Sequence, residues 1–304
     1  MAEEKSNTGI PYQIISDFKF PKSFISECIT STIQYKPRND DIFLSTFPRC
    51  GTTWTQQILY LIFHKGIPPK DGKDFMLFSP YLEMMGIETA NKVRPCVLKV
   101  HLPFHLTPYA PESKYVYVAR NPKDCCVSYY YFLTRTVGNV KITFDEFFEH
   151  FITGEISYGD YFDHVLSWYN HRDDSNVLFL TYEEMKQDIC AVVKKICVFL
   201  GAEYSELIND NEIMKNIVHF SSFDFMKNTT NENYNAIRLQ KDKDLGKIQE
   251  IWEKRKVTDS KLVRKGEVGD WKNHFSASQN ERMNELIQCR FGNTNLLHIW
   301  KDLL

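Results

Sequence analysis

The stretch "LKVHLP" places two side chains capable of proton-transfer chemistry two positions apart, at Lys99 and His101. Alternate residues of a β-strand point to the same face, so a strand here would direct both side chains into one site. A neutral histidine can accept a proton from a hydroxyl or an amine near pH 7, which makes His101 a candidate general base. A hydrogen-bonded structural histidine is the alternative. A zinc pair with His105 is disfavoured, because Pro103 lies between the two histidines.

A second chemical feature is the loop inside "FLSTFPRCGTTWTQQILYLIF", which covers residues 43–63. A strand that turns sharply into a helix points the first helical N–H groups at one spot, where an anion is stabilised. Gly51 allows the backbone to approach such an anion, Thr52 and Thr53 add hydroxyl donors, and Arg49 adds a cation. The G-x-x-x-x-G-K-[ST] pattern of nucleoside triphosphatases is absent, which disfavours a nucleotide kinase.

Further cations stand beside other predicted elements. Arg120 ends a strand-like run in "YVARNPKDCCVSYYYF", and Ser128 follows in the next helix. Arg264, Lys265 and Gly266 stand together in "LVRKGEVGDWK". Taken singly, Arg120 could be an ordinary ion-pair partner, and Arg264 with Lys265 a solvated pair. Together with the loop they predict a pocket for a multiply charged anion.

Short apolar runs separated by helical patterns are expected to position these residues. This alternation predicts an α/β fold, with a central parallel sheet flanked by helices. The expected strands cover residues 42–47, 96–101, 115–119 and 177–181.

Capping signals predict where two of the helices begin. Thr143 with Glu146 and Ser278 with Glu281 each have the spacing of a capping box, in which two side chains satisfy two backbone N–H groups. Gly154 is expected to end the first of these helices.

Composition limits the class of protein. The 304 residues carry a net charge of -2 and are 43% hydrophobic, which is typical of a globular protein without a general attraction to nucleic acid or membranes. Eight cysteines without any Cys-x-x-Cys pair argue against a structural zinc site. The polar, acidic start of the sequence lacks a secretory pattern. We therefore expect a cytoplasmic protein without a metal.

The chain is expected to form one domain over residues 1–304. Residues 1–16 are predicted to be a flexible N-terminal segment. The highly charged residues from about 235 to 265 are predicted to form a mobile cap over the active site.

At these motifs the sequence resembles the cytosolic sulfotransferases, which use 3′-phosphoadenosine 5′-phosphosulfate (PAPS). The resemblance extends from about residue 17 to the last predicted helix. It is carried by "FPRCGTTW" and "RKGEVGDWK", with "LKVHLP", "VYVARNPKDCCVSYY", "YGDYFDHVLSWY" and "LFLTYEEMKQD" between them. It implies a P-loop-like sulfotransferase fold and transfer of a sulfuryl group from PAPS to a hydroxyl or amine of a small acceptor. The second product would be 3′,5′-adenosine bisphosphate, and no metal is expected.

The resemblance also implies site residues. The catalytic residues would be His101, Arg49, Lys99 and Ser128. The PAPS site would contain Arg49, Cys50, Gly51, Thr52, Thr53, Trp54, Arg120, Ser128, Tyr182, Ser221, Ser222, Phe223, Met226, Arg264, Lys265 and Gly266.

The acceptor site implied by the resemblance is rich in aromatic rings, although each ring taken alone could be ordinary core. Such a pocket suits a small phenol or a catecholamine-like amine alcohol. Its residues would be Tyr81, Lys99, His101, Phe104 and Phe132.

Three departures from the family pattern lead to separate expectations. Arg49 replaces the usual lysine, and because arginine keeps the charge, binding of the donor should survive. Because His101 and the 3′-phosphate residues are intact, we expect an active enzyme, with a catalytically weak binder of phosphoadenosine nucleotides or aromatic amines as the alternative. Residues 272–281 differ from the family's dimer segment at Ser276 and Ala277, so a homodimer through this segment is a prediction only. Cys50, beside Arg49 at a helix N-terminus, is expected to have a lowered thiol pKa and to oxidise slowly.

Overall fold

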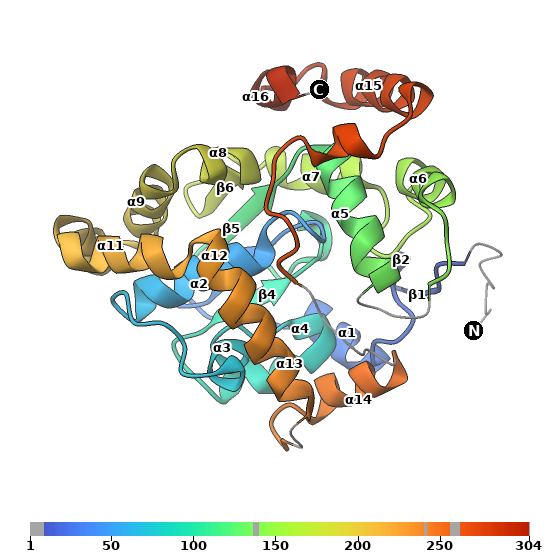
Figure 1. The fold of residues 1–304 in the computed structure, drawn as a ribbon. Coiled ribbons are helices and arrows are strands. Elements are labelled where there is room, and N and C mark those ends of the chain that lie inside the picture. The colour runs from blue at the N-terminus through green and yellow to red at the C-terminus, as the bar shows by residue number, and fades with distance from the viewer. Residues whose placement is uncertain (1–8, 136–139, 240–241, 256–261, 304) are drawn as a thin grey trace.

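Four apolar segments form a parallel sheet at the centre of the molecule (Figure 1). The computed structural model describes residues 9–135, 140–239, 242–255 and 262–303. The strand order is β4-β3-β5-β6, and every neighbouring pair is parallel. The prediction of a central parallel sheet flanked by helices is confirmed. The strands are β3 (Ile42–Ser45), β4 (Val97–Val100), β5 (Lys114–Ala119) and β6 (Val177–Thr181).

Both faces of this sheet are covered, which explains why its strands are continuously apolar in sequence. Ile42 and Leu44 of β3 pack into one hydrophobic cluster, whereas Phe43 packs into the other. The first cluster includes apolar residues of α2 (Thr52–Phe63) and α9 (Ile189–Leu200). The second includes aromatic residues of α6 (Phe144–Thr153) and α7 (Tyr161–Tyr169). Period-two alternation therefore divides each strand between two cores.

The chain leaves β3 for β4 on one side and then passes to β5 on the other side. Open parallel sheets bind ligands beyond the carboxyl ends of their strands, at the point where the strand order reverses. In this sheet that point is the carboxyl end of β3, where the Arg49–Gly51 loop begins its turn into α2.

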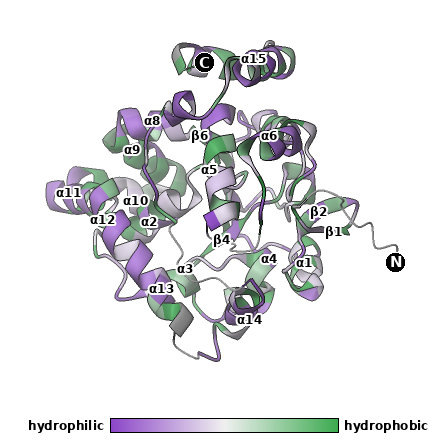
Figure 2. Cartoon of the chain, turned by 45° about the vertical axis from the view of Figure 1, so that its right-hand side comes forward, coloured by the Kyte–Doolittle hydropathy of each residue, from purple (hydrophilic) through white to green (hydrophobic). Residues whose placement is uncertain are grey.

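The remaining helices surround the sheet. Figure 2 shows hydrophilic residues on peripheral helices such as α11 and α13. None of the described helices is long and apolar enough to cross a membrane. These helices are α1 (Ser26–Ile33), α3 (Gly72–Phe78), α4 (Leu82–Met85), α5 (Pro122–Arg135), α8 (Tyr182–Gln187), α10 (Ala202–Ser205), α11 (Asn211–Phe220), α12 (Phe223–Phe225), α13 (Asn231–Leu239), α14 (Gly246–Lys254), α15 (Ala277–Phe291) and α16 (Leu296–Trp300).

A hairpin near the N-terminus was not predicted from the sequence. Strands β1 (Tyr12–Ile15) and β2 (Phe18–Pro21) pair antiparallel, so this part of the segment expected to be flexible is a strand. Residues 1–8 of the same segment lie outside the described residues. The turn adopts positive φ at Ser16 and Asp17 rather than at a glycine, so it lacks the usual sequence signal.

One predicted capping box is confirmed and the other is wrong. The Thr143–Glu146 box begins α6, and Gly154 ends it with a φ of 68°. The second box lies two residues earlier than predicted, at Ser276 and Gln279. Glutamine accepts the hydrogen bond from the Ser276 N–H as glutamate would, so the two candidates were equivalent in pattern. A homodimer through residues 272–281 stays a prediction.

The segment predicted to be a cap contains the end of α13 and the whole of α14. Helix α13 packs tightly on α3. The approach is so close that a Cβ added to Gly72 of α3 would lie 2.7 Å from the carbonyl oxygen of Asn233 in α13. Residues 240–241 and 256–261 of this segment lie outside the described residues. Mobility of the segment stays a prediction.

Candidate active site

The loop between β3 and α2 has a backbone suited to an anion. Arg49 and Gly51 both adopt positive φ, of 75° and 102°. Helix α2 then begins at Thr52. A Cβ on Gly51 would lie 3.0 Å from the Tyr182 ring, so both the conformation and the close packing favour glycine. The turn directs the first N–H groups of α2 into the space beyond the sheet.

That space is a cavity of about 540 Å³. It is bounded by residues that follow β3, β4, β5 and β6, by α12 and α13, and by residues 262–267. The predicted site residues that line it are Arg49, Gly51, Thr52, Thr53, Trp54, Tyr81, Lys99, His101, Arg120, Ser128, Phe132, Tyr182, Ser221, Phe223, Met226, Arg264, Lys265 and Gly266.

Three predicted site residues lie outside the cavity wall. Cys50 is fully buried, and its side chain contacts Cys125, with 3.6 Å between the sulfur atoms. Ser222 caps α12 by accepting a hydrogen bond from the Phe225 N–H. Phe104 stacks on His171 at a ring separation of 3.5 Å. It is not among the residues that line the cavity, so the structure does not support its assignment to the acceptor pocket.

The expectation of a lowered thiol pKa at Cys50 is wrong, whereas its slow oxidation stays a prediction. Burial raises the pKa of Cys50 well above its ordinary value, and the neighbouring Cys125 raises it further. The sequence placed this thiol near a cation and a helix N-terminus, but it did not show that the side chain points into the core.

The tautomer of His101 is fixed by the backbone. Its Nδ1 lies 2.7 Å from the carbonyl oxygen of Thr46, which can only accept a hydrogen bond. The proton of a neutral His101 therefore sits on Nδ1, and Nε2 carries the free electron pair. Within the described residues Nε2 has no hydrogen-bond partner, and the side chain is 7% exposed on the cavity wall.

His101 is held in its neutral form. Burial lowers its pKa well below the ordinary value, and the positive charge of Lys99 lowers it further. A neutral imidazole with a free Nε2 is the form that can accept a proton.

Glu83 is a residue of this site that the sequence analysis missed. It is fully buried in the first turn of α4, and its Oε1 accepts a hydrogen bond of 2.6 Å from the His101 N–H. Its Oε2 is buried without a hydrogen-bond partner in the described structure. Burial raises the pKa of Glu83 to about 8, although the His101 N–H and Lys99 oppose this shift. Because Glu83 precedes β4 by a long loop, only the fold brings it to His101.

Lys99 lies on β4, His101 directly follows that strand, and both residues line the cavity. Its ammonium lies 4.3 Å from the centre of the Tyr81 ring. Burial lowers the pKa of Lys99 to about 8, with Glu83 opposing the shift and Arg49 adding to it. The prediction that this strand directs a cation and a histidine into one site is confirmed.

Aromatic rings border His101 on its other side. The Tyr81 ring lies 5.0 Å from the His101 ring and the Tyr158 ring lies 5.4 Å from it, and the two tyrosine hydroxyls are hydrogen-bonded to each other. Tyr158 is a further wall residue that the sequence analysis missed. Phe132 also lines the cavity and lies under the guanidinium of Arg49, 4.9 Å from it.

The side chain of Arg49 connects the loop after β3 to α5 and to residue Leu262. Its Nε donates to Ser128 Oγ at 3.3 Å, and one terminal nitrogen donates to the carbonyl oxygen of Leu262 at 2.8 Å. Burial lowers the pKa of Arg49 to about 10, and the nearby cation Arg120 lowers it further. Arg49 therefore remains a cation near neutral pH and has no carboxylate partner within the described residues.

Arg120 is a second buried cation without a described carboxylate partner. Its terminal nitrogens donate to the carbonyl oxygens of Arg49 and Glu267, at 3.3 and 3.0 Å. Its Nε is buried without a hydrogen-bond partner in the described residues. The guanidinium lies 4.3 Å from the centre of the Tyr182 ring. A buried donor of this kind fits an anion that supplies the missing acceptor.

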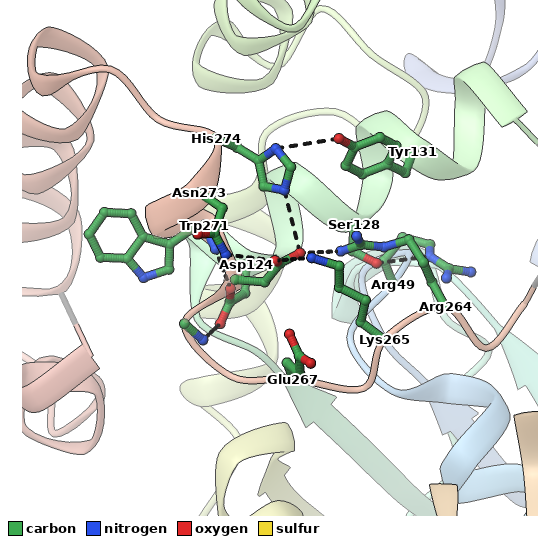
Figure 3. A network of polar contacts seen from close by, with 12 residues as sticks. Arg49, Asp124, Ser128, Tyr131, Arg264, Lys265, Glu267, Trp271, Asn273 and His274 are labelled. Atoms are coloured by element: carbon green, nitrogen blue, oxygen red, sulfur yellow. Dashed lines mark hydrogen bonds and ion pairs between the residues drawn. The ribbon is translucent and has the colours of Figure 1, made fainter. Parts of the chain in front are cut away.

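Arg264 and Lys265 form an ion-pair cluster with Asp270, which the sequence did not predict. They donate to the two carboxylate oxygens of Asp270, at 2.7 and 2.6 Å. Burial disfavours the Asp270 carboxylate, but these two hydrogen bonds outweigh it and hold its pKa below the usual range. Figure 3 shows both cations in one network with Arg49 and Ser128. Asp270 therefore offsets part of the positive charge of this wall.

Asp124 holds the segment that carries these cations. Its carboxylate accepts from the N–H groups of Gly269 and Trp271, at 2.7 and 3.1 Å. The two C-terminal cations are thus fixed against α5, the helix that also carries Ser128 (Figure 3).

An apolar slot formed by the rings of Trp54, Tyr182 and Phe223 completes the cavity. Trp54 donates from Nε1 to the Ser221 carbonyl oxygen at 2.8 Å, and its ring lies 5.4 Å from the Tyr182 ring. Across the cavity, the Phe223 ring lies against Gly266, where an added Cβ would be 2.4 Å from the ring. Aromatic faces with this arrangement suit a planar base.

Gly266→Ala tests this slot. Its φ of +66° and the contact with Phe223 both oppose a side chain. We expect an affinity for 3′,5′-adenosine bisphosphate that is about tenfold lower, because the Phe223 ring must move. Calorimetry measures the affinity. The control is Gly246→Ala, which has nothing within 4 Å of its added Cβ and should bind normally. Equal affinities for both variants would remove Gly266 from the binding site.

Comparisons with known proteins identify the class. A family model for the sulfotransferase domain matches residues 39–296. The chain is 35% identical to sulfotransferase 1C2 of Rattus norvegicus over 277 residues, which cover 86% of each chain. It is 34% identical to the amine sulfotransferase of Oryctolagus cuniculus, over 88% of this chain and 85% of the relative.

A crystal structure of mouse sulfotransferase SULT7A1 complexed with PAP superposes with a TM-score of 0.73 at 28% identity, covering 96% of this chain and 98% of the other. The fold is therefore that of the sulfotransferases. The chain described here belongs to the sulfotransferase family.

The described residues contain no group of three or more histidine, cysteine or acidic side chains that could hold a metal ion.

Proposed function

We propose that this sulfotransferase transfers the sulfuryl group of PAPS to the hydroxyl of a small aromatic acceptor, with His101 as the general base. One observation carries the proposal. His101 presents a free Nε2 in the same cavity as Lys99 and the loop ending at Gly51. A proton acceptor and a loop suited to binding anions thus share one cavity.

The donor would lie across the width of the cavity. Arg120, whose buried Nε lacks an acceptor, and Ser128 would hold the 3′-phosphate with Arg264 and Lys265. The first N–H groups of α2 would hold the 5′-phosphosulfate, with Arg49 beside them. The adenine would lie in the slot between Trp54, Tyr182, Phe223 and Met226, near Ser221.

PAPS supplies the sulfuryl group and a phosphate leaving group. His101 Nε2 accepts the hydroxyl proton as the acceptor oxygen forms its bond to sulfur. The bond from sulfur to the 5′-phosphate oxygen breaks, and its electron pair leaves with that oxygen. Lys99 and Arg49 would stabilise the growing negative charge, so positioning and electrostatics supply most of the acceleration.

A phenol fits this site better than an amine. Tyr81 and Phe132 line the cavity and would offer ring faces to the acceptor. Glu267 is the only acidic residue among the described wall residues, and its carbonyl oxygen already binds Arg120 near the donor site. An ammonium beside Lys99 would therefore meet like charge. A catecholamine-like amine alcohol is the second candidate, and the name of the rabbit relative supports an amine acceptor in general.

Sulfur-labelled PAPS and a panel of phenols, catecholamines and steroids test the proposal. We expect labelled product without added metal. Retention of label without product would support the alternative of a weak nucleotide or amine binder. Transfer of phosphate from ATP with magnesium would instead support a kinase. Absence of any affinity for 3′,5′-adenosine bisphosphate would overturn the assignment of the donor site.

The pH dependence follows from two lowered pKa values. Lys99, with a pKa of about 8, loses its proton and its charge as pH rises above that value. We expect kcat/KM for PAPS, which reports the free enzyme, to fall about tenfold per pH unit above it. His101 stays neutral to well below pH 6.5, so no acidic loss is expected near neutrality. Lys99→Arg should remove the alkaline fall; an unchanged profile would contradict this assignment.

A cytoplasmic location is part of the proposal. It is supported by the eight cysteines, all of which are free thiols, as expected in a reducing compartment. A homodimer through residues 272–281 is also proposed, and sedimentation would test it.

A further inference from the structure

Arg255, directly after α14, adds a cation to the acceptor side of the cavity. It lines the same cavity as His101, although it comes from the opposite end of the fold. Its guanidinium lies 5.0 Å from the centre of the Phe24 ring, and that ring packs against Tyr81 at 5.6 Å. Tyr81 in turn contacts His101. Arg255 is therefore separated from the general base by a short row of aromatic rings.

The guanidinium of Arg255 is incompletely paired. Its Nε donates to Ser23 Oγ at 2.7 Å, but no carboxylate in the described part of the chain pairs with its two terminal nitrogens. Burial lowers its pKa, and the strongest opposing influences are phenols, first Tyr234 and then Tyr81. An arginine nevertheless remains charged near neutral pH. A desolvated guanidinium facing only hydroxyls and rings fits an anionic ligand.

The partners of the other arginines on the cavity wall also indicate that Arg255 faces an anionic ligand. Of the four arginines on its described wall, Arg264 is paired with Asp270. Arg49 and Arg120 donate to backbone carbonyl groups and are the residues proposed to face the phosphates of PAPS. Arg255 likewise has no carboxylate partner, but it faces the other end of the cavity. The donor therefore does not explain its charge.

One neighbouring wall residue adds to the positive potential. Lys22 lines the cavity without an ion pair in the described residues, whereas the charge of the wall residue Lys254 is offset by Glu250 at 2.7 Å. The wall residue Glu267 lies beside Arg120, at the donor side. Apolar rings near Arg255 exclude water, which makes a charge-assisted hydrogen bond there stronger than on the surface.

We propose that Arg255 selects an acceptor that carries a carboxylate as well as the reacting hydroxyl. The fork of donors on arginine matches the two carboxylate oxygens, so Arg255 would hold the anion while the hydroxyl faces His101 Nε2. This inference rests on the proposed sulfotransferase reaction and specifies its acceptor class: aromatic hydroxy acids.

A ladder of phenolic acids tests the inference. The series runs from 4-hydroxybenzoate through 4-hydroxyphenylacetate and 3-(4-hydroxyphenyl)propionate to the butyrate, which moves the carboxylate stepwise away from the hydroxyl. Each acid is compared with its neutral carboxamide, and tyramine supplies the cationic counterpart. We expect one chain length to give an acid preferred over its amide by about tenfold to a hundredfold in kcat/KM. Phenols carrying a sulfonate in place of the carboxylate show whether any oxyanion suffices.

Three variants connect this preference to one side chain. Arg255→Met keeps an unbranched side chain without charge and should abolish the preference for acid over amide. Arg255→Lys should retain part of it, and Arg255→Glu should favour tyramine instead. Arg282→Met, which removes a surface arginine paired with Glu149, is the control and should leave the preference unchanged. Equal turnover of acid and amide by the unsubstituted chain, or an unchanged preference in Arg255→Met, would overturn the inference.

Direct binding separates this inference from the proposed reaction. Acid and amide are titrated calorimetrically into the protein saturated with 3′,5′-adenosine bisphosphate, for the unsubstituted chain and for Arg255→Met. Tight binding of the acid that is lost in Arg255→Met supports the inference even if no phenol is sulfated. Turnover of neutral phenols without any Arg255-dependent binding of acids supports the reaction and rejects the acceptor class.

Discussion

His101→Ala should lower kcat by a factor of about 10² to 10⁴, which is the usual contribution of a general base. The physical reason is specific to one nitrogen. The Thr46 carbonyl fixes the proton on Nδ1, so only Nε2 can take the proton of the acceptor hydroxyl. Initial rates with labelled PAPS measure the loss. Because His101 is neutral, the affinity for 3′,5′-adenosine bisphosphate should change by less than about threefold.

Two further measurements distinguish catalysis from folding. His171→Ala is the matched control, since that exposed histidine pairs with Asp174 outside the cavity and should keep normal turnover. Added imidazole should restore part of the activity of His101→Ala, because it can enter the space that the side chain leaves. Turnover in His101→Ala close to that of the unsubstituted chain would show that another group, or water, removes the proton.

Arg120→Met should weaken the binding of 3′,5′-adenosine bisphosphate by about 100-fold. The side chain is 7% exposed, and its unpartnered Nε gives the predicted phosphate a desolvated, charged donor. Losing hydrogen bonds to a charged group in such a site costs about 3 kcal/mol. Calorimetry with the bisphosphate and with 5′-adenosine monophosphate separates the 3′-phosphate from the rest of the nucleotide. The monophosphate should bind both proteins equally weakly.

A matched arginine controls for the structural role of Arg120. Arg172 also donates to a backbone carbonyl and lies over a tyrosine ring, at 2.9 and 4.1 Å, but it is outside the cavity. Arg172→Met should therefore leave the affinity for 3′,5′-adenosine bisphosphate unchanged. If Arg120→Met instead lost thermal stability and kept its nucleotide affinity, Arg120 would serve to join the Arg49 and Glu267 loops, and the 3′-phosphate would need another site.

The sequence by itself determined the elements that carry the chemistry. Continuous apolar runs identified the four parallel strands, because a strand buried on both faces needs apolar residues throughout. Spacing placed Lys99 and His101 on one face, since the period of a strand is fixed by its backbone. The turn at Gly51 was predictable because few residue types other than glycine accept its φ of 102°.

Only the tertiary structure decided which partners those residues meet. Glu83 beneath His101, Asp270 between Arg264 and Lys265, and Arg255 near Tyr81 are contacts between segments far apart in the chain or between side chains whose directions no local pattern fixes. The same limit explains the error at Cys50, where local neighbours suggested a lowered pKa but the side chain is buried in the core. Local periodicity follows from backbone geometry, whereas charge, exposure and pKa depend on what the whole fold brings within a few ångströms.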